Sequence, residues 1–192
     1  MNNQNLLYDY RDVTTESNVP DEPVTLQEMK DYLRLEGFVD IDESTTESIS
    51  YFLFDDTLIQ NMITAARRKA EDYCGISIVF HSWEALLKNE AGDSELPYGP
   101  VQEITSVLDA DGNEITSDSY TFRGFDFKFM VSPLYDNLTV EYDAGYEDCP
   151  EGVRLAIKQM VAYWYDKRAV GSIPELALTT LAPFKRPWTW LA

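Results

Sequence analysis

The sequence has 192 residues, a length that indicates one domain. Hydrophobic residues make up 44% of it and aromatic residues 13%, which excludes a disordered chain and indicates a globular protein. Its 15 basic and 34 acidic residues give a formal net charge of −19. Because tight binding to a nucleic-acid duplex needs clustered Lys and Arg, this balance argues against sequence-specific DNA binding and favours a protein partner.

The charge is unevenly distributed along the chain. Residues 1–60 and residues 61–149 each carry −11, whereas residues 150–192 carry +3. No apolar run approaches the roughly 20 residues that cross a bilayer, and no leader pattern is visible. The two cysteines, Cys74 and Cys149, are too few for a disulfide framework. We therefore expect a soluble protein with reduced thiols, made in a cytoplasm and not bound to a membrane.

The first expected elements are an arm and a helix. The polar, acidic segment 1–23 predicts a flexible arm, or one that a partner orders. Thr25 and Glu28 have the spacing of a capping box at the start of the next helix. Apolar residues at the 3.6-residue period predict three main helices, at 24–36, 55–75 and 150–170. A short fourth helix is expected between Pro174 and Leu181.

Between the second and third helices the apolar period changes to two, which is typical of strands. The clearest predicted strands are Ser82–Lys88, Val101–Leu108 and Leu138–Tyr142. Residues 109–113 predict a turn, and the phenylalanine-rich segment 122–131 predicts a second hairpin. The segment 80–146 is therefore expected to be an inserted antiparallel β-sheet of four to six strands. The fold class is α+β: a small helical bundle with this sheet inserted, forming one domain over 24–182.

Catalytic signatures are absent from the sequence. The single histidine, His81, has no Ser–His–Asp or Cys–His spacing around it and is interpreted as a packed or surface residue. Asp109 and Asp111 begin a calcium-like pattern, but its glycine, Gly112, comes too early and its twelfth position is Tyr120. A simple turn is the favoured interpretation. We expect no catalytic residue, no cofactor and no metal.

Six segments follow one another in a characteristic order and spacing. They are Thr25–Arg34, Asp56–Ile59, Ala65–Arg67 with Glu71–Gly75, Leu96–Val101, Val140–Tyr146 and Trp164–Arg168. In this order the chain resembles the head–tail connector proteins of long-tailed bacteriophages, also called adaptor or head completion proteins, in the longer version with a β insertion. The resemblance spans roughly residues 24–184.

The resemblance implies a structural virion protein rather than an enzyme. Members of that family assemble as a ring of about twelve subunits beneath the portal, in the neck between head and tail. The ring extends the channel, through which DNA passes without specific binding, and meets the next tail-side connector or tail-terminator protein. The alternative is another tail-side virion component, such as a tail-completion or tail-terminator protein. A small enzyme or ligand-binding domain is the third interpretation, which the missing catalytic residues disfavour.

The C-terminal tail, residues 183–192, is the first candidate partner interface. Two prolines prevent it from forming a regular element. Its aromatic and basic side chains are the candidate docking residues: Phe184, Lys185, Arg186, Trp188 and Trp190. The expected target is the portal or a neighbouring subunit, and the alternative is that the tail folds back onto its own subunit.

Trp164 and Arg168 form a second candidate interface. They stand one turn apart on the predicted helix 150–170, so their side chains could stack on or bracket one partner. Core packing is the alternative role for Trp164, because large aromatic residues more often fill a core than a surface site.

Overall fold

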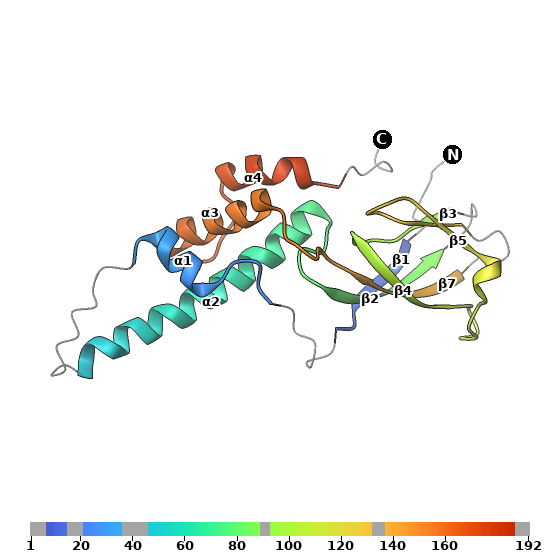
Figure 1. Cartoon of the computed structure of the whole chain (residues 1–192), viewed down its shortest axis with the longest axis horizontal. Helices are drawn as coiled ribbons and strands as arrows, with labels where there is room; N and C mark the ends of the chain where they lie inside the picture. Colours follow the sequence, from blue (N-terminus) through green and yellow to red (C-terminus); the bar gives the residue numbers. More distant parts are fainter. Residues whose placement is uncertain (1–6, 15–20, 36–45, 89–92, 132–136, 187–192) are drawn as a thin grey trace. The chain divides into compact units, whose positions relative to one another are not determined.

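The computed structural model describes residues 7–14, 21–35, 46–88, 93–131 and 137–186. It contains helices and antiparallel sheets (Figure 1), which confirms the predicted α+β class. The chain divides into two compact units. The β-unit comprises Met1–Asp21, Gly75–Asp148 and Arg186–Ala192, and the helical unit comprises Glu22–Cys74 and Cys149–Lys185.

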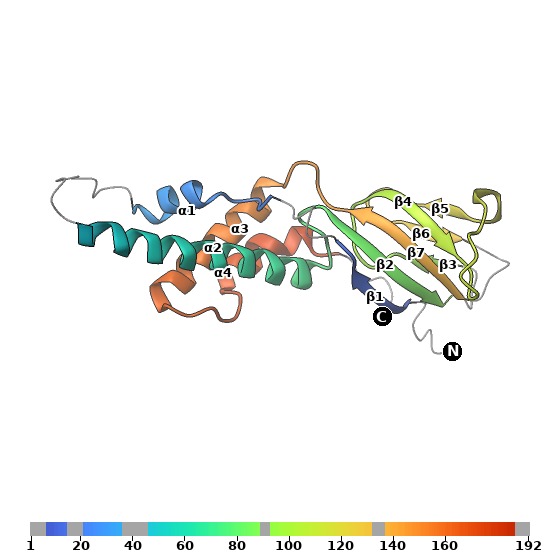
Figure 2. The same ribbon diagram turned by 90° about the horizontal axis from the view of Figure 1, so that it is seen from below.

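The helical unit contains every α-helix in the described part of the chain. These are α1 (Leu26–Leu33), α2 (Thr46–Cys74), α3 (Glu151–Lys167) and α4 (Glu175–Leu181), with the 3₁₀ turn η3 (Ala182–Phe184) after them. Helices α1 and α3 both contact α2, and α4 contacts α3 (Figures 1 and 2). The residues buried on α3 are those that the helical period selects: Val153, Ala156, Ile157, Met160, Val161 and Trp164. None of the helices in the described residues is both long enough and apolar enough to cross a membrane.

The helix boundaries differ from the predicted ones at three places. Helix α2 begins at Thr46 rather than at residue 55. Asp55, where the predicted helix begins, accepts a hydrogen bond from the Tyr165 hydroxyl at 2.8 Å. Helices α1 and α3 end at Leu33 and Lys167, before the predicted ends at 36 and 170, because Arg34 and Arg168 take the left-handed conformation at φ 56° and 52°. Gly75, at φ 68°, follows the end of α2.

The predicted capping box at the start of α1 is confirmed. The Glu28 amide donates to the Thr25 hydroxyl at 3.2 Å, and the Thr25 amide donates to the Glu28 carboxylate at 2.9 Å. Glu28 also pairs with Arg154 and lies 3.7 Å from Lys158, both on α3. The hydrogen bond from Thr25, helped by Lys158 and Arg154, holds the pKa of Glu28 below its usual value. One carboxylate thus caps α1 and ties it to α3.

Glu28→Gln is expected to lower the free energy of unfolding by about 1 kcal/mol at neutral pH. Because the pKa of Glu28 is lower in the folded protein than in the unfolded chain, its charge stabilises the fold above about pH 5. That contribution is lost as the pH falls through the lowered pKa. The difference between variant and wild type should therefore shrink between pH 7 and pH 3 in urea unfolding followed by circular dichroism. Asp72→Asn, which removes an exposed carboxylate of α2, is the control, and a difference independent of pH would contradict the prediction.

The β-unit contains two antiparallel sheets. The four-stranded sheet has the order β1 (Leu7–Asp12), β2 (His81–Lys88), β7 (Asn137–Ala144) and β4 (Val101–Leu108). The three-stranded sheet has the order β3 (Asp93–Glu95), β6 (Phe129–Val131) and β5 (Thr121–Arg123), and a 3₁₀ turn, η2 (Ser117–Ser119), precedes β5. Every one of these strand pairs is antiparallel, as predicted.

Strand β7 is central to the larger sheet and shows the period-two burial that the sequence predicts. Its residues Leu138, Val140, Tyr142 and Ala144 are buried, and the residues between them are not. They share one hydrophobic core with residues of both sheets: Ala85, Leu87, Leu96, Val101, Val107, Ile115 and Met130. The two sheets therefore form one β-unit around this core.

Within the segment 80–146 the described residues form six strands, β2 to β7, which agrees with the predicted four to six. A seventh strand, β1, lies outside that segment and was not predicted. Strand β1 lies in the segment assigned to a flexible arm and pairs with β2. Its alternation of aromatic and charged residues covers only Tyr8 to Arg11, which is too short to predict a strand within a polar segment. Strand β3 is three residues long and entirely polar. The predicted turn at 109–113 is confirmed, since Asp109 accepts from the amides of Asp111 and Asn113 at 2.9 and 2.8 Å.

Candidate interaction surface

The described part of the C-terminal tail is anchored within the protein. The ring of Phe184 lies against Gly152 at the start of α3, where a Cβ atom would come within 2.6 Å of it. The Lys185 ammonium lies 4.9 Å from the centre of the Tyr73 ring. Cys74, which is fully buried, donates its thiol to the Leu181 carbonyl at 3.9 Å. Residues 181–185 therefore pack on the helical unit, which is the fold-back that the sequence left open.

Burial raises the pKa of the Cys74 thiol to about 11, which keeps it protonated at neutral pH. Neither Cys74 nor Cys149 forms a disulfide within the described part of the chain. Cys74 is therefore part of the packing of the helical unit rather than a reactive group.

Arg186 is buried in the β-unit, with 4% of its surface exposed. Its Nε donates to Glu95 at 3.1 Å and one Nη donates to the Leu96 carbonyl at 3.0 Å. The other Nη donates to the Pro97 carbonyl, and the guanidinium lies 4.9 Å from the centre of the Phe127 ring. The guanidinium thus binds the segment that follows β3 and presents no surface to a partner. Trp188 and Trp190 lie outside the described residues.

Trp164 and Arg168 face different surroundings rather than one shared partner. Trp164 is completely buried, and its indole N–H donates to the Ser172 carbonyl at 3.1 Å. Arg168 is exposed, pairs with Asp55 at 3.0 Å and lies over the Tyr165 ring at 4.6 Å. The hydrogen bond from Tyr165, together with Arg168, holds the pKa of Asp55 below its usual value. Trp164 therefore has the core role that the sequence left open.

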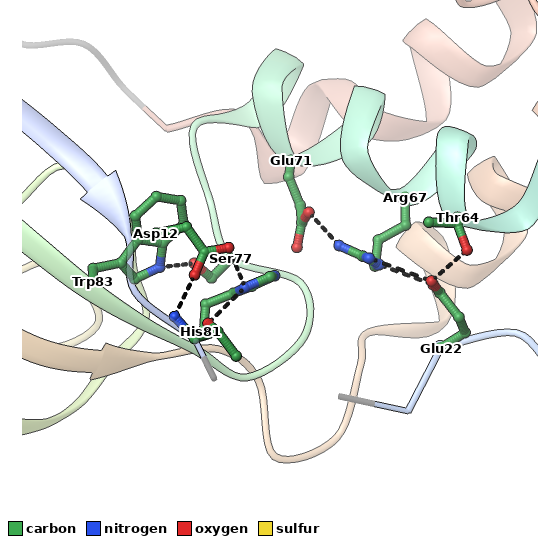
Figure 3. A network of polar contacts seen from close by, with 9 residues as sticks. Asp12, Glu22, Thr64, Arg67, Glu71, Ser77, His81 and Trp83 are labelled. Atoms are coloured by element: carbon green, nitrogen blue, oxygen red, sulfur yellow. Dashed lines mark hydrogen bonds and ion pairs between the residues drawn. The ribbon is translucent and has the colours of Figure 1, made fainter. Parts of the chain in front are cut away.

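A buried ion network in the helical unit surrounds Arg67 (Figure 3). The guanidinium donates to Glu22 at 2.8 Å and to Glu71 at 2.7 Å. The Thr64 hydroxyl donates to Glu22 at 2.8 Å. Arg67 thus forms internal salt bridges within the helical unit.

A second polar network joins β1 to β2 in the β-unit (Figure 3). His81 Nδ1 lies 3.0 Å from the Asp12 carboxylate, and the Trp83 indole donates to Ser77 at 2.9 Å. Burial by itself raises the pKa of Asp12. Hydrogen bonds from Thr14 and the contact with His81 outweigh burial and hold the pKa of Asp12 below its usual value. His81 is therefore a packed histidine that positions β1. No group of three or more metal-ligating side chains occurs among the described residues.

The structure also reveals a surface that the sequence analysis did not identify. Four large apolar side chains of α3, α4 and the loop between them are exposed: Leu155, Tyr163, Val170 and Leu176, at 42%, 47%, 49% and 65%. Leu155 and Tyr163 stand four residues on either side of Gln159 on α3, so all three share one helix face. The signal was present in the sequence, because both residues lie outside the apolar positions that predict the buried face of this helix.

Comparison with known proteins gives the chain a family and a fold. The family model described as head completion protein matches residues 24–173. No curated protein sequence matches the chain. The neck of an empty gene transfer agent (GTA) particle, computed with C6 symmetry, contains a chain with TM-score 0.70 and 18% identity. The alignment covers 96% of this protein and 99% of that chain.

A second solved structure, the neck of a native GTA particle computed with C12 symmetry, matches with TM-score 0.69 and 14% identity over 96% and 99% of the two chains. The virion of the native particle matches with TM-score 0.69, 17% identity and the same coverage. At these identities the likeness establishes a shared fold that extends over nearly the whole chain.

Proposed function

The chain belongs to the head completion protein family, and we propose that it is the structural connector that forms a ring beneath the portal and joins head to tail. The family match over residues 24–173 is the observation that carries this function. The fold shared with chains of GTA necks supports a place in the neck of the virion. The role is one of assembly, without catalysis or a cofactor.

The ring is proposed to contain about twelve copies, the symmetry with which one of the similar necks was computed. Its channel would continue that of the portal, and its far side would meet the next tail-side connector or tail-terminator protein. The net charge of −19 supports passage of DNA without specific binding, because an acidic wall repels phosphate.

Native mass spectrometry tests the connector role. The chain is mixed with the portal ring encoded in the same genome. A complex with a fixed number of copies that matches the portal symmetry is expected. Absence of a complex, together with location of the chain along or at the far end of purified tails, would assign it to the tail instead.

The tail beyond Arg186 is proposed to dock on the portal or on a neighbouring copy through Trp188 and Trp190. Each tryptophan can bury roughly 150–250 Å² of surface, and repetition around a ring adds avidity. Phe184, Lys185 and Arg186 have contacts within the protein. The truncated variant should therefore keep Arg186 and lack the residues that follow it. Removing residues 187–192 is expected to weaken portal binding at least tenfold, whereas removing residues 1–6 is the control. Unchanged portal binding would refute a docking role for the tail.

A further inference from the structure

Strand β1 is bound through both its backbone and its side chains at the edge of β2. Its backbone pairs antiparallel to β2, with Arg11 opposite Glu84, and the Arg11 guanidinium donates to Glu84 at 2.7 Å. The Tyr10 ring lies edge-on to the rings of Trp83 and Tyr98, at 6.1 and 5.3 Å between centres. Those two rings stack on each other at 4.3 Å. We call this edge of β2, together with the Trp83 and Tyr98 rings, the strand site.

The strand is held at the surface of the β-unit. Main-chain pairing combined with side-chain selection is the way in which extended peptides bind at the edge of a sheet. None of the side chains from Asp9 to Asp12 is buried, so they add nothing to the core. The contacts at the strand site would therefore be the same for a strand that another copy of the chain supplies.

The covalent route from β1 to its site is long. Between β1 and β2 the chain passes through α1 and α2 of the helical unit. Thr14, just after β1, accepts from the Ser82 amide at 3.0 Å in the β-unit. Glu22 accepts from the Arg67 guanidinium at 2.8 Å in the helical unit.

The chain between these two anchors is long enough to reach a second copy. Thr14 and Glu22 are eight positions apart, and an extended chain of that length spans at most about 26–29 Å. That reach is about twice the roughly 13 Å radius of gyration of a domain of about 100 residues, which is the size class of the β-unit. With both anchors in place, the strand of one copy can therefore lie on the strand site of an adjacent copy.

We propose that β1 of each copy binds the strand site of the next copy in the ring. The proposal rests on the ring of the proposed function, whose closure needs a head-to-tail contact between two different surfaces of one protein. The strand and the strand site are two such surfaces, and their backbones and side chains fit each other. Every copy gives one strand and receives one, so a closed ring leaves no site empty.

Exchange of the strand also ties together copies that repel one another. Each copy carries −19, so side-by-side copies need a specific contact to stay associated. Exchange loses none of the contacts at the strand site and joins each copy to its neighbour through its own chain. In a ring the neighbouring site is present at a high effective concentration, which favours binding between copies.

Disulfide trapping between two single variants tests the exchange. Asp9 lies opposite Leu86 in the pairing of β1 with β2, and both side chains are exposed. One variant carries Asp9→Cys and the other Leu86→Cys. Both also carry Cys149→Ser, so the buried Cys74 is the native thiol that remains. Equal amounts are assembled on the portal and oxidised. Neither variant holds both new thiols, so a disulfide between positions 9 and 86 forms only between copies, and we expect it in the portal-bound ring.

The double variant with Asp9→Cys and Leu86→Cys is the matched control. As a dilute free chain it should close the disulfide within itself, which shows that the geometry permits the bond. In the portal-bound ring it should link many copies in series. Disulfides confined to single chains in that ring, with none between the two single variants, would overturn the exchange and leave the connector role standing. Linked copies from a concentrated chain that never binds the portal would refute the connector role and leave the exchange standing.

Charge reversal of the Arg11–Glu84 pair supplies an independent readout by native mass spectrometry of portal-bound rings. Arg11→Glu and Glu84→Arg should each weaken association between copies at least fivefold, because each places like charges opposite one another. In an equal mixture each substituted residue meets the opposite charge on the next copy, so association should recover. A strand that stays on its own copy keeps the like-charged pair in every chain, and a mixture without recovery would overturn the proposal. Arg123→Glu is the control, because it reverses an exposed cation of β5 outside the strand site.

Discussion

Replacing Arg186 with alanine is expected to lower the free energy of unfolding of the β-unit by about 3–5 kcal/mol. The substitution removes a buried cation and leaves Glu95 and the carbonyls of Leu96 and Pro97 without these hydrogen bonds. Removing one partner of a buried pair costs more than the pair contributes, because the remaining charge stays away from water. The β-unit contains nineteen acidic residues, so an unpaired carboxylate there is also repelled by its surroundings.

Urea unfolding and native-state hydrogen exchange of the β-unit measure this effect. Arg186→Lys keeps the charge but not the planar fork that reaches three acceptors, so it should lie between alanine and the wild type. Lys185→Ala is the matched control, because Lys185 is the adjacent cation in the sequence, is exposed and lies over the Tyr73 ring. That variant should lose at most about 1 kcal/mol. An Arg186→Ala protein as stable as the wild type would show that the buried pair is not formed in solution.

Replacing Trp164 with alanine is expected to destabilise the helical unit by about 3–5 kcal/mol. Trp164 is the largest fully buried side chain of the protein's described residues, so truncation leaves a cavity on α3. The change also removes the donor to the Ser172 carbonyl, which fixes the loop between α3 and α4. Trp164→Phe retains most of the apolar contact but not this donor and should cost less, about 1–2 kcal/mol.

Thermal and urea unfolding of both variants check the prediction, with Tyr163→Ala as the control. Tyr163 precedes Trp164 on α3 but is 47% exposed, so its removal should change stability little. A Trp164→Ala protein as stable as the wild type would contradict the core role of Trp164.

The sequence by itself determined the elements whose signals are local. The capping box of Thr25 and Glu28, the buried face of α3 and the alternation of β7 all follow from side-chain periods within one element. The turn that Asp109 closes depends on residues no more than four positions away. The order of such segments was also enough to indicate the head completion family, which the family match then confirmed.

Only the tertiary structure decided the elements and residues that depend on distant partners. Strand β1 is recognisable only beside β2, because its alternation of aromatic and charged residues is short and lies in a polar segment. Arg186 looked like a docking residue, since nothing near it in the sequence reveals Glu95, which lies 91 positions away. Trp164 and Tyr163 are neighbours in the sequence, yet one fills the core and the other lies exposed. The physical reason is the same in each case: burial and charge pairing are set by contacts between segments far apart in the chain, which local patterns do not record.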